Sequence, residues 1–178
     1  MPIFTTTIST PVGNLLAGAT GAGICLLDFP YRKMIEAIKV RISISLGEPF
    51  AEGEHPHFIA LRAQLKEYFK GERMTFDLPL VMAGSPFQQQ VWKALQDIPY
   101  GETRSYKAQS VLLGSEGAIR AIARANGENG LAILVPCHRV IGENGSLTGY
   151  SGGLDKKRWL LTHERSRIGR EVQGELFG

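Results

Sequence analysis

The feature that most constrains the fold is a change of hydrophobic pattern close to residue 84. Before it, runs rich in Thr, Ile and Leu at residues 3–8, 15–20 and 24–29 are separated by glycine-containing turns, a pattern typical of a small antiparallel meander. After it, Ser85-Pro86-Phe87-Gln88 has the capping serine, early proline and following glutamine of a helix start. The chain is therefore expected to fold as two halves of different construction.

Two predicted helices complete the first half. Apolar residues recur at intervals of three and four over residues 34–42 and again over residues 58–69, where Gly71 ends the second helix. Alternation over residues 76–80 predicts one more strand. Residues 1–80 are thus expected to form an N-terminal α/β structural domain, a small antiparallel sheet with helices, followed by a linker at residues 81–84.

The second half is predicted to be mainly helical. One helix runs from Pro86 and ends before Pro99, a second starts at Tyr106 behind a capping Ser105, and a third covers residues 116–126. Short helices joined by brief turns indicate a helix-turn-helix. We therefore expect an α+β chain in which residues 85–178 form a helical, winged-helix-like domain.

Composition limits the classes of protein to which this chain can belong. Hydrophobic residues make up 43% and charged residues 21%, as in a globular protein, and no apolar run is long enough to cross a membrane. Because a secretion signal is not recognisable, the chain is expected in a reducing compartment, the cytoplasm or, in a eukaryote, the nucleus. Residues 85–178 carry twelve Lys and Arg against nine Asp and Glu, whereas residues 1–84 carry eight of each. This imbalance weakly indicates a polyanionic partner for the second half.

The two cysteines, Cys25 and Cys137, are far apart in the sequence and are expected to be free thiols. A metal site is not expected, because no Cys and His side chains occur at ligand spacing. Residues 131–135 are apolar on both faces, so a buried extended segment is predicted to lead into Cys137.

Cys137 stands in the run Pro136-Cys137-His138-Arg139, which places a base and a cation beside a thiol. A thiol is nucleophilic only as thiolate, which such neighbours favour. Adjacent side chains on an extended chain point apart, so contact between His138 and Cys137 requires a bend at Pro136 or a bridging water. From the residue types alone, a nucleophile and a buried structural cysteine are equally well supported.

The predicted third helix is rich in alanine and carries two arginines on one face, Arg120 and Arg124. Small side chains allow a close approach to another surface, and an arginine can enter a narrow groove. An alanine-rich core helix with two solvated arginines is the simpler interpretation of this segment alone. Tyr106 can stack on a base or merely pack, and Glu164 alone reads as a surface carboxylate.

Taken together, the motifs resemble those of the 6-O-alkylguanine-DNA alkyltransferase family. The active-site run Pro136-Cys137-His138-Arg139-Val140-Ile141-Gly142 carries the resemblance, and five further stretches match in order and spacing across residues 85–165. They are Phe87-Gln88-x-x-Val91-Trp92, Ser105-Tyr106, Ala118-Ile119-Arg120-Ala121-Ile122, Gly149-Tyr150-Ser151-Gly152-Gly153-Leu154 and Lys157-Arg158-Trp159-Leu160-Leu161-x-His163-Glu164. Residues 1–80 match only in outline, as the family's variable, ribonuclease H-like domain.

The resemblance implies a role for each matching residue. Cys137 would accept the alkyl group, His138 would act as its base through a water, Glu164 would orient His138, and Asn129 would brace the turn before the active site. Tyr106 would assist rotation of the nucleotide and donate a hydrogen bond to the purine. Backbone groups of Cys137 and Val140, with the loop at Tyr150 and Ser151, would line the guanine pocket. On the DNA side, Arg120 would fill the gap left by the extruded base, with Ser105, Ala121 and Arg124 beside it.

The implied activity is DNA repair by direct reversal, in which a methyl or other alkyl group moves irreversibly from O6 of a flipped-out guanine to Cys137. Action on O4-alkylated thymine is left open. Double-stranded DNA would be bound through the minor groove by a monomer that needs no cofactor. Only Cys25 is available for the structural zinc of some relatives, so no such zinc is expected. Gly130 departs from the family's usual proline, and Lys107-Ala108-Gln109-Ser110 is less apolar than its usual pattern.

Two other classes of protein fit part of the sequence. A cysteine hydrolase could use Cys137, His138 and Glu164, but it would turn over and would leave the arginine-bearing helix without a role. A helix-turn-helix binding module could contain an inert cysteine. Stoichiometry separates repair from hydrolysis, and the Cys137→Ser variant separates repair from a pure binding module, because only a repair protein would lose alkyl transfer.

Overall fold

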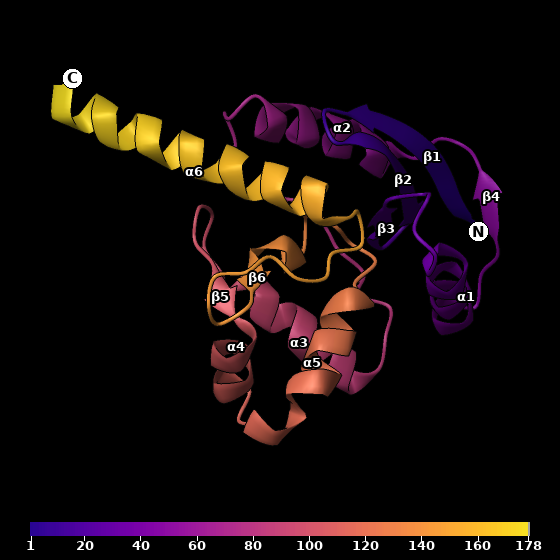
Figure 1. Cartoon of the computed structure of the whole chain (residues 1–178). Helices are drawn as coiled ribbons and strands as arrows, with labels where there is room; N and C mark the ends of the chain where they lie inside the picture. Colours follow the sequence, from indigo (N-terminus) through magenta and orange to yellow (C-terminus); the bar gives the residue numbers. More distant parts are fainter. Residues whose placement is uncertain (178) are drawn as a thin grey trace.

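The computed structural model describes residues 1–177, and the side chains of residues 1–168. The N-terminal meander is confirmed: β1 (Ile3–Thr10), β2 (Gly13–Thr20) and β3 (Gly23–Asp28) pair antiparallel in sequence order (Figure 1). A fourth strand that the sequence did not indicate, β4 (Phe50–Glu52), pairs in parallel with the start of β1, so the sheet order is β3-β2-β1-β4. The sheet is therefore mixed at this edge.

Helices α1 (Ile35–Leu46) and α2 (Pro56–Phe69) complete the N-terminal half. The predicted strand over residues 76–80 is wrong, because only Leu80 forms a bridge, to Ile24 of β3. The Ile24 N–H donates to Pro79 O and the Val81 N–H donates to Ile24 O, each at 2.8 Å. Pro79 has no N–H with which to extend this pairing into a ladder.

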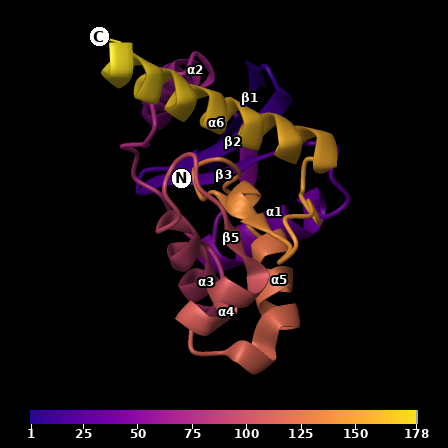
Figure 2. The same ribbon diagram turned by 60° about the vertical axis from the view of Figure 1, so that its left-hand side comes forward.

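The C-terminal half contains the three predicted helices, α3 (Pro86–Gln96), α4 (Tyr106–Leu112) and α5 (Ile119–Gly127), the last preceded by the 3-10 turn η1 (Glu116–Ala118). Ser85 and Gln88 form a reciprocal capping box, and the Ser105 hydroxyl accepts the Ala108 N–H at 3.0 Å. The short parallel pair β5 (Arg104–Ser105) and β6 (Val140–Ile141) precedes α6 (Leu154–Phe177). Figures 1 and 2 show α3, α4 and α5 gathered at one end of the molecule, with α6 crossing the other end beside α2.

The segment over residues 131–135 is buried as predicted, but the prediction that it is extended is wrong. The Val135 N–H donates to Leu131 O at 2.9 Å, and Ile133 has a φ of 72°, in the left-handed region. Asn129 explains the turn, because its side chain accepts the Leu131 N–H and donates to Val135 O, each at 2.9 Å. The Asn129 side-chain amide thereby stabilises the turn immediately before Cys137.

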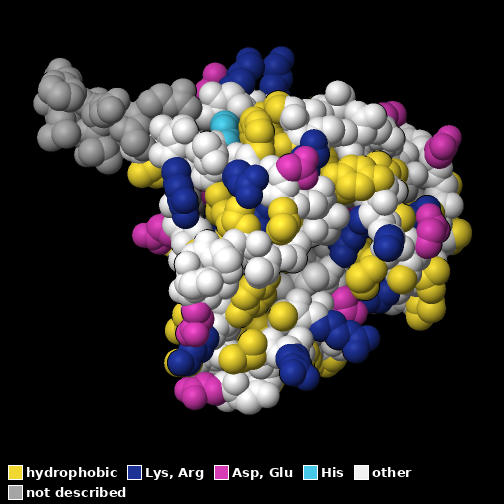
Figure 3. Space-filling model, viewed as in Figure 1, with side chains coloured by type: hydrophobic (Ala, Val, Ile, Leu, Met, Phe, Trp, Pro, Cys, Tyr) yellow, Lys and Arg dark blue, Asp and Glu magenta, His cyan; other side chains and the backbone are white. Residues whose placement is uncertain are grey.

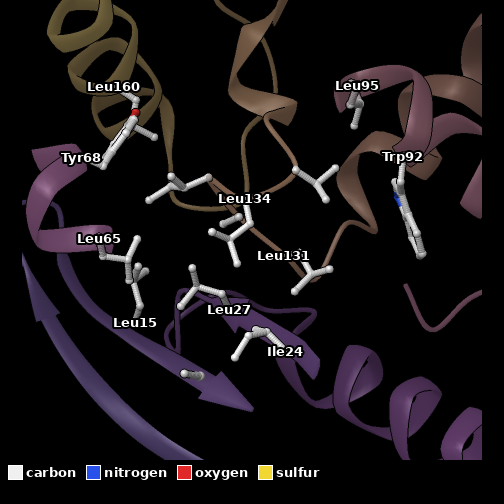
Figure 4. Close-up of a cluster of buried hydrophobic side chains, with 14 of the residues drawn as sticks. Leu15, Ile24, Leu27, Leu65, Tyr68, Trp92, Leu95, Leu131, Leu134 and Leu160 are labelled. Carbon is white, nitrogen blue, oxygen red and sulfur yellow. The ribbon is translucent and has the colours of Figure 1, made fainter. Parts of the chain in front are cut away.

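One hydrophobic core runs through both halves of the chain. Leu27 of β3 and Leu65 of α2 belong to the same cluster as Trp92 of α3 and Leu160 of α6 (Figure 4). Leu131, in the segment that follows α5, belongs to this cluster as well. The division into domains at residues 81–84 remains a prediction, since the packing itself is continuous there. In the part of the chain that the structure describes, no helix has both the length and the apolar character needed to span a membrane.

Candidate functional site

Cys137 is the first residue of a short 3-10 turn, η2 (Cys137–Arg139). The Arg139 N–H donates to Pro136 O at 3.0 Å and closes the turn. The chain therefore bends at Pro136, so the cysteine and the histidine that follows it do not lie on an extended strand. Cys137 is half-buried and lines a cavity, and the Asn129 side-chain amide donates to Cys137 Sγ at 3.3 Å.

His138 and Glu164 form a buried pair behind the cysteine. His138 Nε2 lies 2.8 Å from Glu164 Oε2, and neither side chain is exposed. His138 Nδ1 has no hydrogen-bond partner among the described residues. Burial lowers the pKa of His138 below its usual value, although Glu164 opposes the shift. At neutral pH the imidazole is therefore uncharged, with Nδ1 free to accept a proton once Nε2–H donates to Glu164.

The Glu164 carboxylate accepts hydrogen bonds from Arg139 and Tyr68 in addition to its contact with His138. Arg139 donates through Nε to Oε1 at 2.8 Å and through a terminal nitrogen to Oε2 at 3.0 Å, and the Tyr68 hydroxyl donates to Oε2 at 2.7 Å. Burial alone would raise the pKa of Glu164, but His138 and Arg139 hold it well below its usual value. Glu164 is therefore an ionised buried carboxylate, and the alternative of a surface carboxylate is wrong.

Burial raises the pKa of the Cys137 thiol, and the hydrogen bond from Asn129 partly offsets this effect. Such a thiol is protonated at neutral pH, so a base must remove its proton before the sulfur can attack. The described residues form no direct hydrogen bond between Cys137 and His138, so a proton transfer between them would require the bridging water that the family resemblance implies. The Asn129 amide, which donates to Cys137 Sγ, would also stabilise a negative charge on that sulfur.

The cavity above Cys137 has a volume of about 460 Å³. The residues that line it come from α4, α5, η2, the loop before α6 and the segment of the N-terminal half before α1: Arg32, Met34, Tyr106, Ala123, Asn126, Gly127, Cys137, Thr148, Gly149, Tyr150 and Ser151. The Tyr150 hydroxyl and the Ser151 hydroxyl are buried, and the described residues offer them no hydrogen-bond partner. Unpartnered groups of this kind suit a ligand that carries hydrogen-bonding groups.

Lys157 of α6 holds one wall of this cavity and was missed as a site residue. Its ammonium group is fully buried and donates to Val140 O at 2.5 Å and to Thr148 O at 2.8 Å, while the Tyr106 hydroxyl donates to Thr148 O at 3.3 Å. Burial lowers the pKa of Lys157 to about 8. Val140 is not among the residues that line the cavity, and its carbonyl is occupied by Lys157. The only signal in the sequence was the place of Lys157 in a motif shared with the family.

The N-terminal half supplies a further wall. The Tyr31 hydroxyl donates to Gly152 O at 2.6 Å, and the Arg32 guanidinium donates to the carbonyls of Gly127 and Asn129. The Phe29 ring meets the Tyr150 ring edge-on at 5.8 Å. Periodicity could not reveal these contacts, because they join segments about a hundred residues apart.

The predicted DNA-binding residues of α5 lie away from the cysteine, on the surface. Arg120, Ala121 and Arg124 are exposed, whereas Ile122 and Ala125 face the core. Arg124 lies 3.6 Å from Glu128 and its side chain is 82% exposed. Figure 3 shows Lys and Arg side chains along the lower part of this face, around the position of α5 in Figure 1. The placement fits a DNA contact and also fits solvated arginines on a packed helix.

Cys25 lies in β3 and is buried, and burial raises the pKa of its thiol to about 12. Such a thiol is chemically inert at neutral pH. Among the residues that the structure describes, no three His, Cys, Asp or Glu side chains lie together as metal ligands would.

Comparison with known proteins gives matches over both halves. The model described as "6-O-methylguanine DNA methyltransferase, ribonuclease-like domain" matches residues 3–82, and that described as "6-O-methylguanine DNA methyltransferase, DNA binding domain" matches residues 86–166. The constitutive methylated-DNA–protein-cysteine methyltransferase of Bacillus subtilis is 43% identical over 90% of this chain and 94% of its own length. The corresponding protein of Methanosarcina barkeri is 42% identical over 90% of this chain and 96% of its own length.

Solved structures agree with these matches. The crystal structure of the Mycobacterium tuberculosis O6-methylguanine methyltransferase has a TM-score of 0.78 and 42% identity, and it covers 93% of this chain and 94% of its own. A structure of the M. tuberculosis protein OGT in complex with DNA has a TM-score of 0.79 at the same identity and coverage. The chain therefore shares its mixed α+β fold, with a helical C-terminal half, with the M. tuberculosis protein over almost the whole of its length.

Proposed function

The chain belongs to the 6-O-methylguanine DNA methyltransferase family, and we propose that Cys137 is the residue that accepts the alkyl group. Its relatives are named for the transfer of a methyl group from DNA to a cysteine, and the chain carries out the same direct-reversal repair. Cys25 is the alternative acceptor by residue type, but it is buried in β3 and its pKa is raised to about 12. Cys137 instead opens onto the cavity.

The observation that carries the assignment is the buried His138–Glu164 pair immediately after a cysteine that lines a cavity. The thiol proton would pass through a water to His138 Nδ1. The sulfur would then bond to the alkyl carbon while the carbon–oxygen bond to guanine breaks, and the electron pair of that bond would stay on the guanine. The guanine would take up a proton, so that overall the alkyl group and the thiol proton exchange places.

Glu164 would hold the imidazole in the tautomer that leaves Nδ1 free, and would stabilise the imidazolium that forms. Asn129 would stabilise the developing thiolate through its hydrogen bond to Sγ. The product is a thioether, a bond that neither a carboxylate nor an imidazole can easily break. Each molecule is therefore expected to react once.

The cavity would receive the guanine after its nucleotide rotates out of the duplex. The Tyr150 and Ser151 hydroxyls, unpartnered among the described residues, would bind polar atoms of the base. Tyr106 lines the same cavity from α4, and its hydroxyl would turn from Thr148 O, 3.3 Å away, to donate to the ring as negative charge develops. Protein donors at the ring make the guanine a better leaving group.

The exposed face of α5 would enter the minor groove as a monomer binds duplex DNA. Ala121 would permit a close approach, Arg120 would occupy the gap in the base stack, and Arg124 and Ser105 would contact the flanking DNA. The net positive charge of the second half supports this orientation.

Intact-mass measurement with peptide mapping tests the assignment. After incubation with a duplex that carries one O6-methylguanine, we expect one added methyl group, on the peptide that contains Cys137. The Cys137→Ser variant should bind the duplex but leave it methylated, and Cys25→Ser should react like the unmodified chain. Methyl groups on Cys25, or repaired DNA with unchanged protein mass, would contradict the proposal, and the second result would indicate turnover.

A further inference from the structure

We propose that Tyr68, contributed by the N-terminal half, is a positioning residue for the alkyl transfer, because its hydroxyl fixes Glu164 and limits how strongly that carboxylate attracts His138. The inference rests on the proposed function, in which His138 is the base. It assigns a part in the chemistry to the ribonuclease-like half of the chain, outside all of the matched active-site motifs.

The geometry of Glu164 Oε2 is the first step. Three donors converge on this one oxygen: the Tyr68 hydroxyl at 2.7 Å, His138 Nε2 at 2.8 Å and an Arg139 terminal nitrogen at 3.0 Å. Hydrogen bonds to a shared acceptor compete for its electron density. The bond from Tyr68 therefore weakens the attraction between Glu164 and the His138 imidazolium.

The position of Tyr68 is the second step. It lies at the C-terminal end of α2 and is fully buried, and its pKa is raised well above 10 by burial and by Glu164. The hydroxyl therefore remains a donor throughout the working pH range. His163 lies 2.7 Å from the Tyr68 backbone oxygen through Nε2, which ties this end of α2 to α6, the helix that carries Glu164.

The surroundings leave few other groups that could produce the same effect. The titratable or charged side chains that face Tyr68, Glu164 or His138 are Arg139 and Cys137 of η2, Lys157 and His163 of α6, and Tyr100 and Tyr150 of two loops. Arg139 is held by Glu164 and by Ile98 O at 2.7 Å, and its guanidinium stacks on the Tyr100 ring at 5.6 Å. Among the three donors to Oε2, Tyr68 is the one whose donor group can be removed without the loss of a charge. The substitution Tyr68→Phe also keeps the ring in place.

The test is the pH dependence of the methyl-transfer rate in the Tyr68→Phe variant of the full chain. Without the hydroxyl, Glu164 holds the imidazolium more tightly, so His138 is protonated at higher pH and the base is lost earlier on acidification. We expect the acid limb of the rate profile to move up by about half to one pH unit. The rate should fall roughly three- to tenfold at a pH below both midpoints and change little at a pH above both.

Phe58→Leu is the matched control, because Phe58 is a fully buried residue of the same helix that makes no hydrogen bond to Glu164. It should perturb packing without moving the acid limb. His163→Gln tests whether the other imidazole against Tyr68 sets the limb, and it should leave the midpoint in place. In a Glu164→Gln background, Tyr68→Phe should cause no further shift.

Nuclear magnetic resonance of the ¹⁵N-labelled His138 ring gives a second measurement that does not depend on reaction rates. An unmoved acid limb and an unmoved His138 titration in Tyr68→Phe would overturn the proposal, as would an equal shift in Phe58→Leu. These results would leave the proposed function intact if Cys137 is still methylated. Absence of methyl transfer to Cys137 in the unmodified chain would instead contradict the proposed function itself.

Discussion

At the scale of single residues, Asn129 links the fold to the chemistry. Its one side-chain amide closes the turn over residues 131–135 through Leu131 and Val135, and also donates to Cys137 Sγ. The resemblance to the family implied a bracing role for Asn129. The structure adds that the same nitrogen serves both the backbone turn and the thiol.

The Asn129→Ala variant should therefore lose both stability and reactivity. The buried Leu131 N–H would be left without its partner, while Val135 O would keep the Cys137 N–H at 2.8 Å, so the free energy of unfolding, measured in urea, should fall by about 1–3 kcal/mol. Loss of the bond to the developing thiolate should slow methyl transfer roughly ten- to a hundredfold. Gln109→Ala is the control, because it breaks a buried amide pair with Asn126 but donates nothing to Cys137. Equal transfer rates in the two variants would remove Asn129 from the chemistry.

Residues that carry the site divide into those that a local motif can predict and those that only packing reveals. Cys137, His138 and Glu164 were predicted because they stand in motifs with fixed spacing. Lys157 stands in the same matched motif as Glu164 but was given no role, because a lysine in a helix is the ordinary appearance of a surface residue. Tyr68 lies outside the motifs, and its position in the site depends on a contact across 96 residues, which no local pattern encodes.

At the scale of elements, helix starts were the most predictable feature. The capping box at Ser85 and the cap at Ser105 are local hydrogen-bond patterns, and both form as predicted. Strand β4 has three residues, too few to show alternation, and residues 76–80 alternate but form only a single bridge to β3, at Leu80. Pairing in a sheet is decided by distant segments, so alternation alone overpredicted one strand and missed another.

Helix α5 supplies the prediction that belongs to this scale. Arg120→Ala should slow repair of duplex DNA by about tenfold or more, because rotation of the nucleotide costs a few kcal/mol and the arginine offsets part of that cost. Reaction with a free O6-alkylguanine base should change less than about twofold, since no base stack is opened. The measurement compares methyl-transfer rates on the two substrates.

Arg124→Ala is the matched control on the same exposed face. It should weaken binding to damaged and undamaged duplexes alike and reduce the salt dependence of binding, as loss of a phosphate contact does. If Arg120→Ala slows both substrates equally, the role of Arg120 in replacing the base is wrong, and a general effect on the site would be indicated.

At the scale of the whole molecule, the sequence suggested two halves, whereas the packing joins them. The N-terminal half donates to Glu164 through Tyr68 and to Gly152 through Tyr31, and the hydrophobic cluster is continuous between α2 and α3. A core shared in this way makes the stability of each half depend on the other. The N-terminal half is thus part of the active site's support, although its sequence contains no recognisable chemistry.

This dependence predicts a single cooperative unfolding transition. Leu61 of α2 is fully buried in the shared cluster, so Leu61→Ala should lower the free energy of unfolding by about 2–5 kcal/mol. The two tryptophans, Trp92 and Trp159, lie in the C-terminal half and pack against Arg41 and Phe69 of the N-terminal half, so their fluorescence reports on the C-terminal half and on its contacts with the half that contains the substitution. We expect the fluorescence and far-ultraviolet circular dichroism midpoints in urea to coincide and to shift together.

Ile59→Ala, at a position on the same helix that is 72% exposed, should change the free energy of unfolding by less than about 0.5 kcal/mol. Fluorescence that keeps its original midpoint while the dichroism shifts would mean that the halves unfold independently, and that Tyr68 can leave Glu164 without loss of the C-terminal fold.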